Sequence, residues 1–391
     1  MPTTTLISVA MALALASCQS ASPPAADTTA AITDSAPDAT QAHDTAEISA
    51  TPDTATTPTC PPGTHAQAGL GCASALTAWT AGPKLKHKRD HHVTLVAETQ
   101  SGPYLFVLAG AGSAGGVLQV ERSAIAADGS LADFEDVGKL PKALIGPGMA
   151  QLGTAFVLAG GLGDDSASVT DTFVGTIDAN GEVALQKGPP LANSRYHVAL
   201  VYAKGFVFAA GGLFQGMAGG VPDQKVLDAV ERAPFDGTTL GPFVAQPPLP
   251  GKLTHHAMLF YQDAIYVLGG GAQLAATTDI LRATVSATGE LGPWQKVGAL
   301  ALGIASPAAT VVGQQVYVVA GMTSLTQGEQ SGVLRADFGA NGTIGPFTAM
   351  PPLPLQRAHS HQAPYFNGWL YSAGGSIEHV PQGNVYVGSL Q

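Results

Sequence analysis

The sequence predicts an all-β protein assembled from six copies of one repeat of roughly 50 residues. Hydrophobic residues make up 45% of the 391 residues, which is enough for a large core, while charged residues make up only 12%. The 48 glycines and 28 prolines are typical of an all-β chain with many turns. The repeat shows as a strand that ends in small residues at intervals of 50 to 59 residues. Its marker glycines are Gly110, Gly160, Gly211, Gly270, Gly321 and Gly374.

Each repeat is expected to contain four strands. Two strands lead up to the marker glycine, as in residues 197–208 (HVALVYAKGFVF), and a third and fourth follow it around a glycine turn. Asn-Gly and Asp-Gly pairs favour the positive φ angles of a tight hairpin. A four-stranded meander has two apolar faces that it cannot bury alone, so the units should pack radially. The turn pairs are Asp128-Gly129, Asn180-Gly181, Asp236-Gly237, Thr288-Gly289 and Asn341-Gly342.

The glycine doublet at the end of the second strand resembles the kelch repeat family. The resemblance covers residues 75–391 and implies a six-bladed β-propeller with four antiparallel strands per blade. Two repeats depart from the pattern, because Gly110-Ala111 and Gly321-Met322 lack a second glycine at the marker. The fourth-strand tryptophan of the family is present at Trp294, and three repeats have phenylalanine instead: Phe134, Phe243 and Phe347.

The last repeat ends in NVYVGSLQ and lacks its fourth strand. A segment of the missing type lies before the first repeat, in residues 75–83 around Trp79. We therefore expect residues 75–83 to form the outer strand of the last blade. This pairing would join the two ends of the repeat region and close the ring.

The N-terminal residues 1–17 are similar to a signal peptide, with an apolar core too short for a stable transmembrane span. The core ends in Leu15-Ala16-Ser17-Cys18, which resembles a bacterial lipobox and implies a lipid on Cys18. Gln19 after the cysteine implies the outer membrane, on its periplasmic or its surface side. The alternative is an ordinary secretory signal peptide, and in both cases the chain leaves the cytoplasm.

Residues 18–59 contain no lysine, arginine or aromatic residue and carry six acidic side chains. Such a segment cannot bury enough apolar surface to fold and is expected to be a disordered tether. Cys60 and Cys72 then frame the loop 60–74, where a disulfide is expected in an oxidising compartment, worth about 2–3 kcal/mol. A metal site with His65 is the alternative, but two cysteines and one histidine fall short of a tetrahedral set.

Several function classes are excluded by composition and by missing motifs. The net charge is −11, with no long basic run, so nucleic-acid binding is not expected. Copper oxidases with a kelch domain need a cysteine cross-linked to tyrosine, and no cysteine follows Cys72. No catalytic residue, cofactor or metal ligand is predicted, and the chain is expected to be a monomer.

Candidate ligand-binding residues recur where the first strand of a blade begins. Three repeats open with Arg-x-His, and in a propeller these turns share a face with the glycine-rich loops that follow the second strand. A partial cationic ring at the channel mouth could bind an anion or a sugar acid. The alternative is that these side chains fix turns by bonding backbone carbonyls, which recurrence in several repeats favours. The candidates are Arg89, His91, Arg195, His197, His255, His256, Arg357, His359, His361 and, in the longest loop 213–226, Phe214.

Two further features bear on the ring. It is broken at Ile145-Gly146-Pro147 and Ile304-Ala305-Ser306, which carry neither Arg nor His. A second column of arginines on the third strands is expected to lie between neighbouring blades or on a solvated face. Its members are Arg122, Arg232, Arg282 and Arg335.

The predicted function is a non-enzymatic, lipid-anchored envelope or surface protein whose propeller binds a protein or a glycan. One alternative is a periplasmic sugar-acid mutarotase, similar to the sialic-acid mutarotases with six kelch blades. It would need an acid–base pair in the channel, and Asp164 and Asp165 are the nearest loop acids. A purely structural envelope protein is the third possibility.

Overall fold

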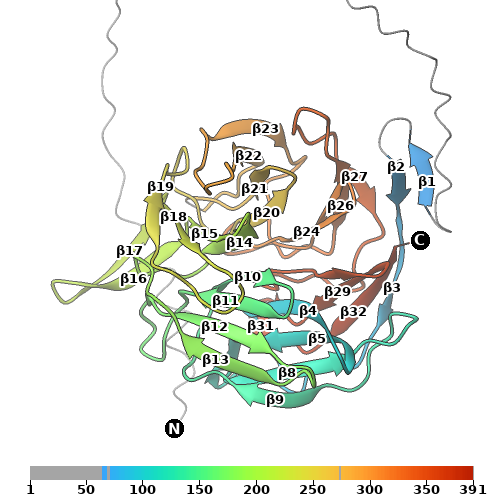
Figure 1. The fold of residues 1–391 in the computed structure, drawn as a ribbon, viewed down its shortest axis with the longest axis horizontal. Coiled ribbons are helices and arrows are strands. Elements are labelled where there is room, and N and C mark those ends of the chain that lie inside the picture. Colours follow the sequence, from blue (N-terminus) through green and yellow to red (C-terminus); the bar gives the residue numbers. More distant parts are fainter. Residues whose placement is uncertain (1–63, 68–70, 273, 391) are drawn as a thin grey trace, which may run out of the picture. The chain divides into compact units, whose positions relative to one another are not determined.

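The computed structural model describes residues 64–67, 71–272 and 274–390. Six four-stranded antiparallel sheets surround a common axis, with the first strand of each sheet innermost and the fourth outermost (Figure 1). This confirms the predicted six-bladed β-propeller, and the arrangement is consistent with the kelch type. The first strands of successive blades, from the first blade to the sixth, contact one another around the axis.

The blades follow the chain in order. Blade 1 comprises β4 (Val93–Thr99), β5 (Gly102–Leu108), β8 (Gln119–Ala124) and β9 (Glu135–Lys139). Blade 2 comprises β10 (Gly148–Leu152), β11 (Ala155–Ala159), β12 (Thr172–Ile177) and β13 (Val183–Lys187). Blade 3 comprises β14 (Ala199–Ala203), β15 (Phe206–Ala210), β18 (Val230–Pro234) and β19 (Val244–Gln246).

Blade 4 comprises β20 (Ala257–Tyr261), β21 (Ala264–Leu268), β22 (Asp279–Thr284) and β23 (Gln295–Ala299). Blade 5 comprises β24 (Ala308–Val312), β25 (Gln315–Val319), β26 (Val333–Asp337) and β27 (Thr348–Met350). Blade 6 comprises β28 (Tyr365–Phe366), β29 (Trp369–Ala373), β32 (Val385–Leu390) and β3 (Leu76–Ala81). Four short hairpins complete the described strands: β1–β2 (Thr64–Gln67, Gly71–Ser74), β6–β7 (Ala111–Gly112, Gly115–Gly116), β16–β17 (Leu213–Ala218, Val221–Val226) and β30–β31 (Ser376–Ile377, Val380–Pro381).

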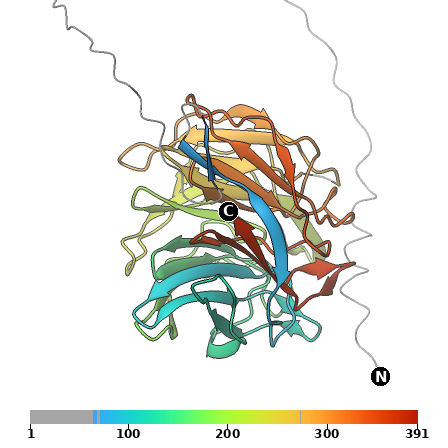
Figure 2. The ribbon, with the colours of Figure 1, turned by 90° about the vertical axis from the view of Figure 1, so that its right-hand side faces the viewer.

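The ring closes as predicted. Strand β3, blue in Figure 2, pairs antiparallel with the C-terminal strand β32, and Trp79 lies opposite Gly388. The Trp79 indole N–H donates to the carbonyl of Pro351 in blade 5 at 3.0 Å. Trp294 in blade 4 makes the same contact with Pro247 in blade 3, at 3.2 Å. Residues 75–83 therefore supply the fourth strand of blade 6 in the same way that other blades supply their own.

The hydrophobic core is divided into clusters that lie between neighbouring blades. One cluster, for example, joins Phe106 and Leu108 of blade 1 to Phe156 and Phe173 of blade 2. Both faces of each sheet are thus buried by the sheets on either side, which is why the sequence is apolar without strict alternation.

The glycine doublets join the blades, and the structure corrects their phase in three repeats. In blade 1 the doublet is Ala109-Gly110, and in blade 5 it is Ala320-Gly321. Alanine thus replaces the first glycine of these two doublets, and the second glycine is present. In blade 4 the doublet begins at Gly269 and not at Gly270. The second position is glycine in all six blades, and its N–H donates to a carbonyl of the next blade at 2.8–3.1 Å. The six donors are Gly110, Gly161, Gly212, Gly270, Gly321 and Gly375.

The second doublet position should not tolerate a side chain. At Gly270 the φ is 84°, and a Cβ would overlap the carbonyl oxygen of Thr254 and the side chain of His256. Gly205 has nearly the same φ, 87°, but no atom lies within 4 Å of the position of its Cβ. Gly205→Ala should cost the backbone strain alone, about 1–3 kcal/mol, and Gly270→Ala about 1–3 kcal/mol more. Denaturant unfolding of the two variants tests this, and an equal loss in both would contradict it.

The predicted turn pairs are confirmed. Each turn glycine has a positive φ, from 72° at Gly342 to 96° at Gly237. The column of third-strand arginines reaches these turns: Arg122 of blade 1 donates to the carbonyl of Asn180 in blade 2 at 2.5 Å, and Arg232 donates to that of Thr288. Arg122 and Arg232 therefore join neighbouring blades, which is one of the two roles predicted for this column.

Several predictions fall outside the described residues. These are the signal peptide 1–17, lipidation at Cys18, the tether 18–59 and the disulfide, since Cys60 is not described. Within the loop 60–74, strands β1 and β2 pair as a hairpin. In the described part of the chain there is no helix of the length and apolar character needed to cross a bilayer.

Candidate functional site

Six equivalent residues, one in each blade, lie just before the first strand and have a left-handed backbone. Four of these positions are histidine, and glycine and serine occupy the other two. For a histidine or serine this conformation is uncommon and costs free energy. The six residues are His91 (φ 52°), Gly146 (65°), His197 (49°), His255 (57°), Ser306 (49°) and His359 (57°).

Backbone hydrogen bonds link these residues from blade to blade. Gly146 N–H donates to the carbonyl of His91, and His197 N–H donates to that of Gly146, both at 2.8 Å. Equivalent bonds run from Ser306 to His255 at 2.7 Å and from His91 to His359 at 2.8 Å. The left-handed conformation turns the N–H of these four donors toward the preceding blade, so the strain is offset by joining the blades.

The imidazole rings of five predicted histidines converge at this axial ring. His91 stacks on His359 with ring centroids 4.0 Å apart, and His197 stacks on His255 at 3.6 Å. His361 lies parallel to His197 at 5.4 Å. We call His91, His197, His255, His359 and His361 the axial histidine cluster.

Within the cluster three residues place their ligand nitrogens close together. The candidate metal-binding atoms of His91, His197 and His359 all lie within 4.8 Å of one another. His91 Nδ1 is 2.8 Å from a carboxylate oxygen of Asp90, and His359 Nδ1 is 3.2 Å from the hydroxyl of Ser376. These contacts leave the other ring nitrogen, Nε2, of each residue available.

Other polar atoms of the cluster are buried and unpaired. No described residue hydrogen-bonds to Nδ1 of His197 or to either ring nitrogen of His255. Burial lowers the pKa of His197, His255 and His359 well below the usual range. These three imidazoles are therefore neutral at neutral pH, and their lone pairs are free to bind.

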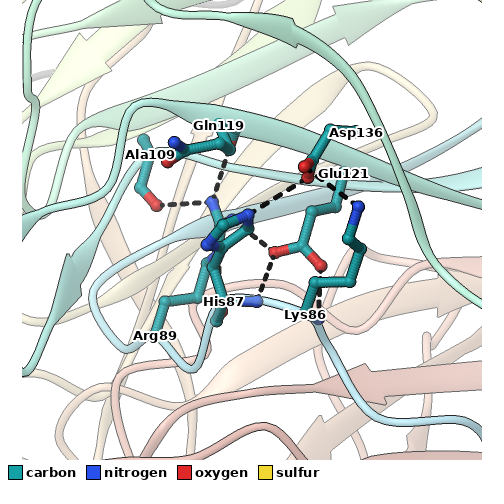
Figure 3. A network of polar contacts seen from close by, with 7 residues as sticks. All are labelled: Lys86, His87, Arg89, Ala109, Gln119, Glu121 and Asp136. Carbon is teal, nitrogen blue, oxygen red and sulfur yellow. Dashed lines mark hydrogen bonds and ion pairs between the residues drawn. The ribbon is translucent and has the colours of Figure 1, made fainter.

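The predicted arginines lie inside their own blades, not at the axis. Arg89 is fully buried and forms an ion pair with Glu121 at 2.5 Å (Figure 3). Its guanidinium also donates to the carbonyls of Ala109 at 3.1 Å and Gln119 at 3.0 Å. Glu121 in turn accepts the backbone N–H groups of Lys86 and His87, so the carboxylate is enclosed by donors.

Arg195 repeats this arrangement, whereas Arg357 faces a tyrosine in the place of the glutamate. Arg195 pairs with Glu231 and donates to the carbonyls of Gly211 and Ala229 at 3.0 and 2.9 Å. Arg357 donates to the carbonyl of Ser372 at 3.2 Å and lies over the ring of Tyr386 at 4.8 Å. Burial lowers the pKa of Arg357 to about 10.

This geometry favours the structural alternative for the three arginines. A sugar-acid site needs guanidinium groups that face the ligand, whereas Arg89, Arg195 and Arg357 are between 0% and 2% exposed. Asp165, one of the two loop acids considered for an acid–base pair, accepts the N–H of Ala167 within its own loop at 3.1 Å.

His256 also lies away from the axial cluster. It is 7% exposed and packs against Gly211 and Gly270 of the doublets in blades 3 and 4. Burial, and to a lesser degree the nearby Arg195, lowers the pKa of His256 to about 3. Its role is therefore in the contact between blades.

The shifted pKa of His256 predicts acid sensitivity. Between pH 6.5 and about 3 the unfolded chain binds a proton here that the folded chain does not. Stability should therefore fall as the pH falls, by about 1.4 kcal/mol per pH unit from this residue. His256→Val, which copies Val198 at the equivalent position of blade 3, should remove about 2–3 kcal/mol of the difference in unfolding free energy between pH 6.5 and 4.5. Both proteins are measured with chelator present, so that no metal ion on the nearby histidines affects the result. Equal dependence of the unfolding free energy on pH in the two proteins would contradict this.

Phe214 is the predicted site residue of the long loop 213–226. It lies on β16 and lines a hollow of about 450 Å³, with Lys225 Nζ 5.7 Å from the centre of its ring. The other residues lining the hollow are Thr170, Ala192, Asn193, Ser194 and Leu227. An aromatic ring beside amide, hydroxyl and ammonium groups is a surface that could accept a sugar.

Comparisons with known proteins add no family to this picture. A scan of protein-family models found no match to the chain, and a search of curated proteins found no significant match.

Proposed function

We propose that this protein is a lipid-anchored binding scaffold of the cell envelope, whose kelch-type propeller presents one face of loops to a protein partner. The proposal is supported by exposed apolar side chains on that face. In a propeller, loops that follow the second strand share a face with loops that enter the first strand. Exposed large apolar residues gather on these loops: Met217 (65% exposed), Val221 (63%), Val380 (58%), Leu302 (54%) and Leu274 (50%).

The loops of this face are also joined to one another. Leu325 N–H of blade 5 donates to the carbonyl of Leu274 in blade 4 at 2.9 Å. Ser168 N–H of blade 2 donates to the carbonyl of Gln215 in blade 3 at 2.8 Å. Exposed apolar residues on loops that are held in place lose little conformational entropy when a partner binds, which favours protein recognition.

Photo-crosslinking in the cells that make the protein tests this proposal. A benzophenone amino acid would replace Met217 or Leu274 on the loop face, and Asp263 in the turn between β20 and β21 serves as the control on the opposite face. Asp263 is 75% exposed. Discrete adducts from the loop-face positions alone would support the proposal. No adduct there, or the same adducts from both faces, would overturn it.

Anchoring through Cys18 is tested separately. An alkyne fatty acid fed to the cells should label the wild-type protein, and Cys18→Ser should be unlabelled and move from the membrane fraction to the soluble fraction. An unlabelled wild-type protein would contradict the lipid anchor without affecting the loop-face proposal.

A glycan ligand is the second candidate, and the hollow beside Phe214 favours it. Binding of the full chain to a glycan array should then be lost in Phe214→Ala and kept in Phe366→Ala, which changes an aromatic residue of blade 6. No binding by the wild-type protein would leave the protein partner as the function.

A further inference from the structure

We propose that His91, His197 and His359 form a binding site for one divalent transition-metal ion, such as Zn²⁺ or Co²⁺, on the axis of the propeller. The site does not depend on what binds to the loop face. Its three ligands come from blades 1, 3 and 6, and their ligand nitrogens already lie within 4.8 Å of one another. Metal–nitrogen bonds of about 2.0–2.1 Å would require the nitrogens to move closer together and the stacked rings of His91 and His359 to turn toward the ion.

Two of the three ligands have an orienting partner. Metal-binding histidines usually use their second ring nitrogen to bond a carboxylate or another oxygen, which fixes the tautomer and the ring orientation. Asp90 lies 2.8 Å from His91 Nδ1, and the Ser376 hydroxyl lies 3.2 Å from His359 Nδ1. These contacts leave the lone pair of Nε2 in both rings for the ion.

Unpaired buried atoms around the ring are the second observation. Nδ1 of His197, both nitrogens of His255 and the hydroxyl of Ser306 have no hydrogen-bond partner among the described residues. His255 is 3% exposed and stacks at 3.6 Å on His197. Leaving such groups unpaired is unfavourable, and an ion with its bound water would reduce that cost.

The donor set indicates the class of ligand. Imidazole nitrogens favour zinc, copper, nickel and cobalt, whereas magnesium and calcium prefer oxygen ligands. An anion is disfavoured, because the Asp90 carboxylate lies beside the ring of His91. Three histidines leave a fourth position open to water or to an exogenous ligand.

Cobalt binding to the full chain, after removal of metal with chelator, tests the site. Titration should give one Co²⁺ per chain, with the visible absorption of a nitrogen and oxygen ligand set and no thiolate charge-transfer band. His91→Asn, His197→Asn and His359→Asn should each weaken binding by more than about 100-fold, since each removes a ligand. Asparagine is chosen because it tolerates the left-handed backbone better than most residues.

Two further variants test the orienting partner and the specificity of the site. Asp90→Asn keeps all three ligands and should weaken binding by about 10–100-fold, the usual effect of losing an orienting partner. His87→Asn, which changes a surface histidine beside Asp136, should bind Co²⁺ as the wild type does. Melting curves of each metal-free variant show whether it is folded. The spectrum of the wild-type protein tests the site even where a variant does not fold. The proposal is overturned by the absence of saturable binding, by a thiolate band, or by binding that the three asparagine variants retain.

Discussion

Deleting residues 60–83 should lower the melting temperature by about 10 °C or more. Strand β3 pairs with β32 along its length, and it buries Leu76 in the cluster that contains Tyr386 and Leu390. Its loss would leave an unpaired strand edge at the point where the ring closes, and would remove the bond from Trp79 to Pro351. A loss of several kcal/mol shifts the melting temperature of a domain of this size by roughly that amount.

Deleting residues 60–74 alone is the matched control. This variant loses the β1–β2 hairpin and both cysteines of the predicted disulfide but keeps β3 whole. It should melt within a few degrees of the wild type. If both deletions reduce the melting temperature equally, the stability resides in the loop 60–74 and not in closure of the ring.

The closure could be predicted from the sequence because it depends on local strand pattern. A repeat that lacked its fourth strand, and a spare strand containing Trp79 before the first repeat, were both visible in the sequence. The phase of the doublets was not visible, because Ala109-Gly110 and Gly110-Ala111 are equally small pairs. The member that must be glycine is shown only by its backbone φ angle and by the atoms that an added Cβ would meet.

The candidate site was predicted less completely. The converging histidines were found because they recur at one position of the repeat. A metal site was not predicted, because its ligands are 106 and 162 residues apart, from His91 to His197 and from His197 to His359. Spacing along the chain therefore carries no metal-binding motif, and only the radial arrangement of blades brings the nitrogens together.

The partners of the arginines were also missed, although the sequence held a signal. Where a blade has the buried arginine, the facing position on its third strand holds Glu121, Glu231 or Tyr386. Where the arginine is replaced by leucine or isoleucine, that position is apolar as well. The apolar pairs are Leu144 with Phe173, Leu253 with Leu281, and Ile304 with Leu334, each within one hydrophobic cluster. The two positions vary together among the six blades, which is the behaviour of a structural pair.

Glu121→Ala should therefore destabilise the protein by about 3–5 kcal/mol, since it leaves Arg89 buried without its carboxylate. The N–H groups of Lys86 and His87 would lose their acceptor as well. Glu135, which pairs with Arg122 at 2.8 Å but is 58% exposed, provides the control, and Glu135→Ala should change the unfolding free energy by less than about 1 kcal/mol.

A double variant distinguishes the cost of an unpaired charge from the loss of a needed ion pair. Arg89→Leu with Glu121→Leu copies the apolar pair Leu253 and Leu281 of blade 4, and a buried ion pair can often be replaced by apolar residues at little cost. We expect the double variant to recover most of the stability that Glu121→Leu alone loses, measured by denaturant unfolding at pH 7. If the double variant is as unstable as the single one, the charged pair itself is required in blade 1. The alternation between charged and apolar pairs would then reflect a difference between the blades rather than two equivalent ways of filling one position.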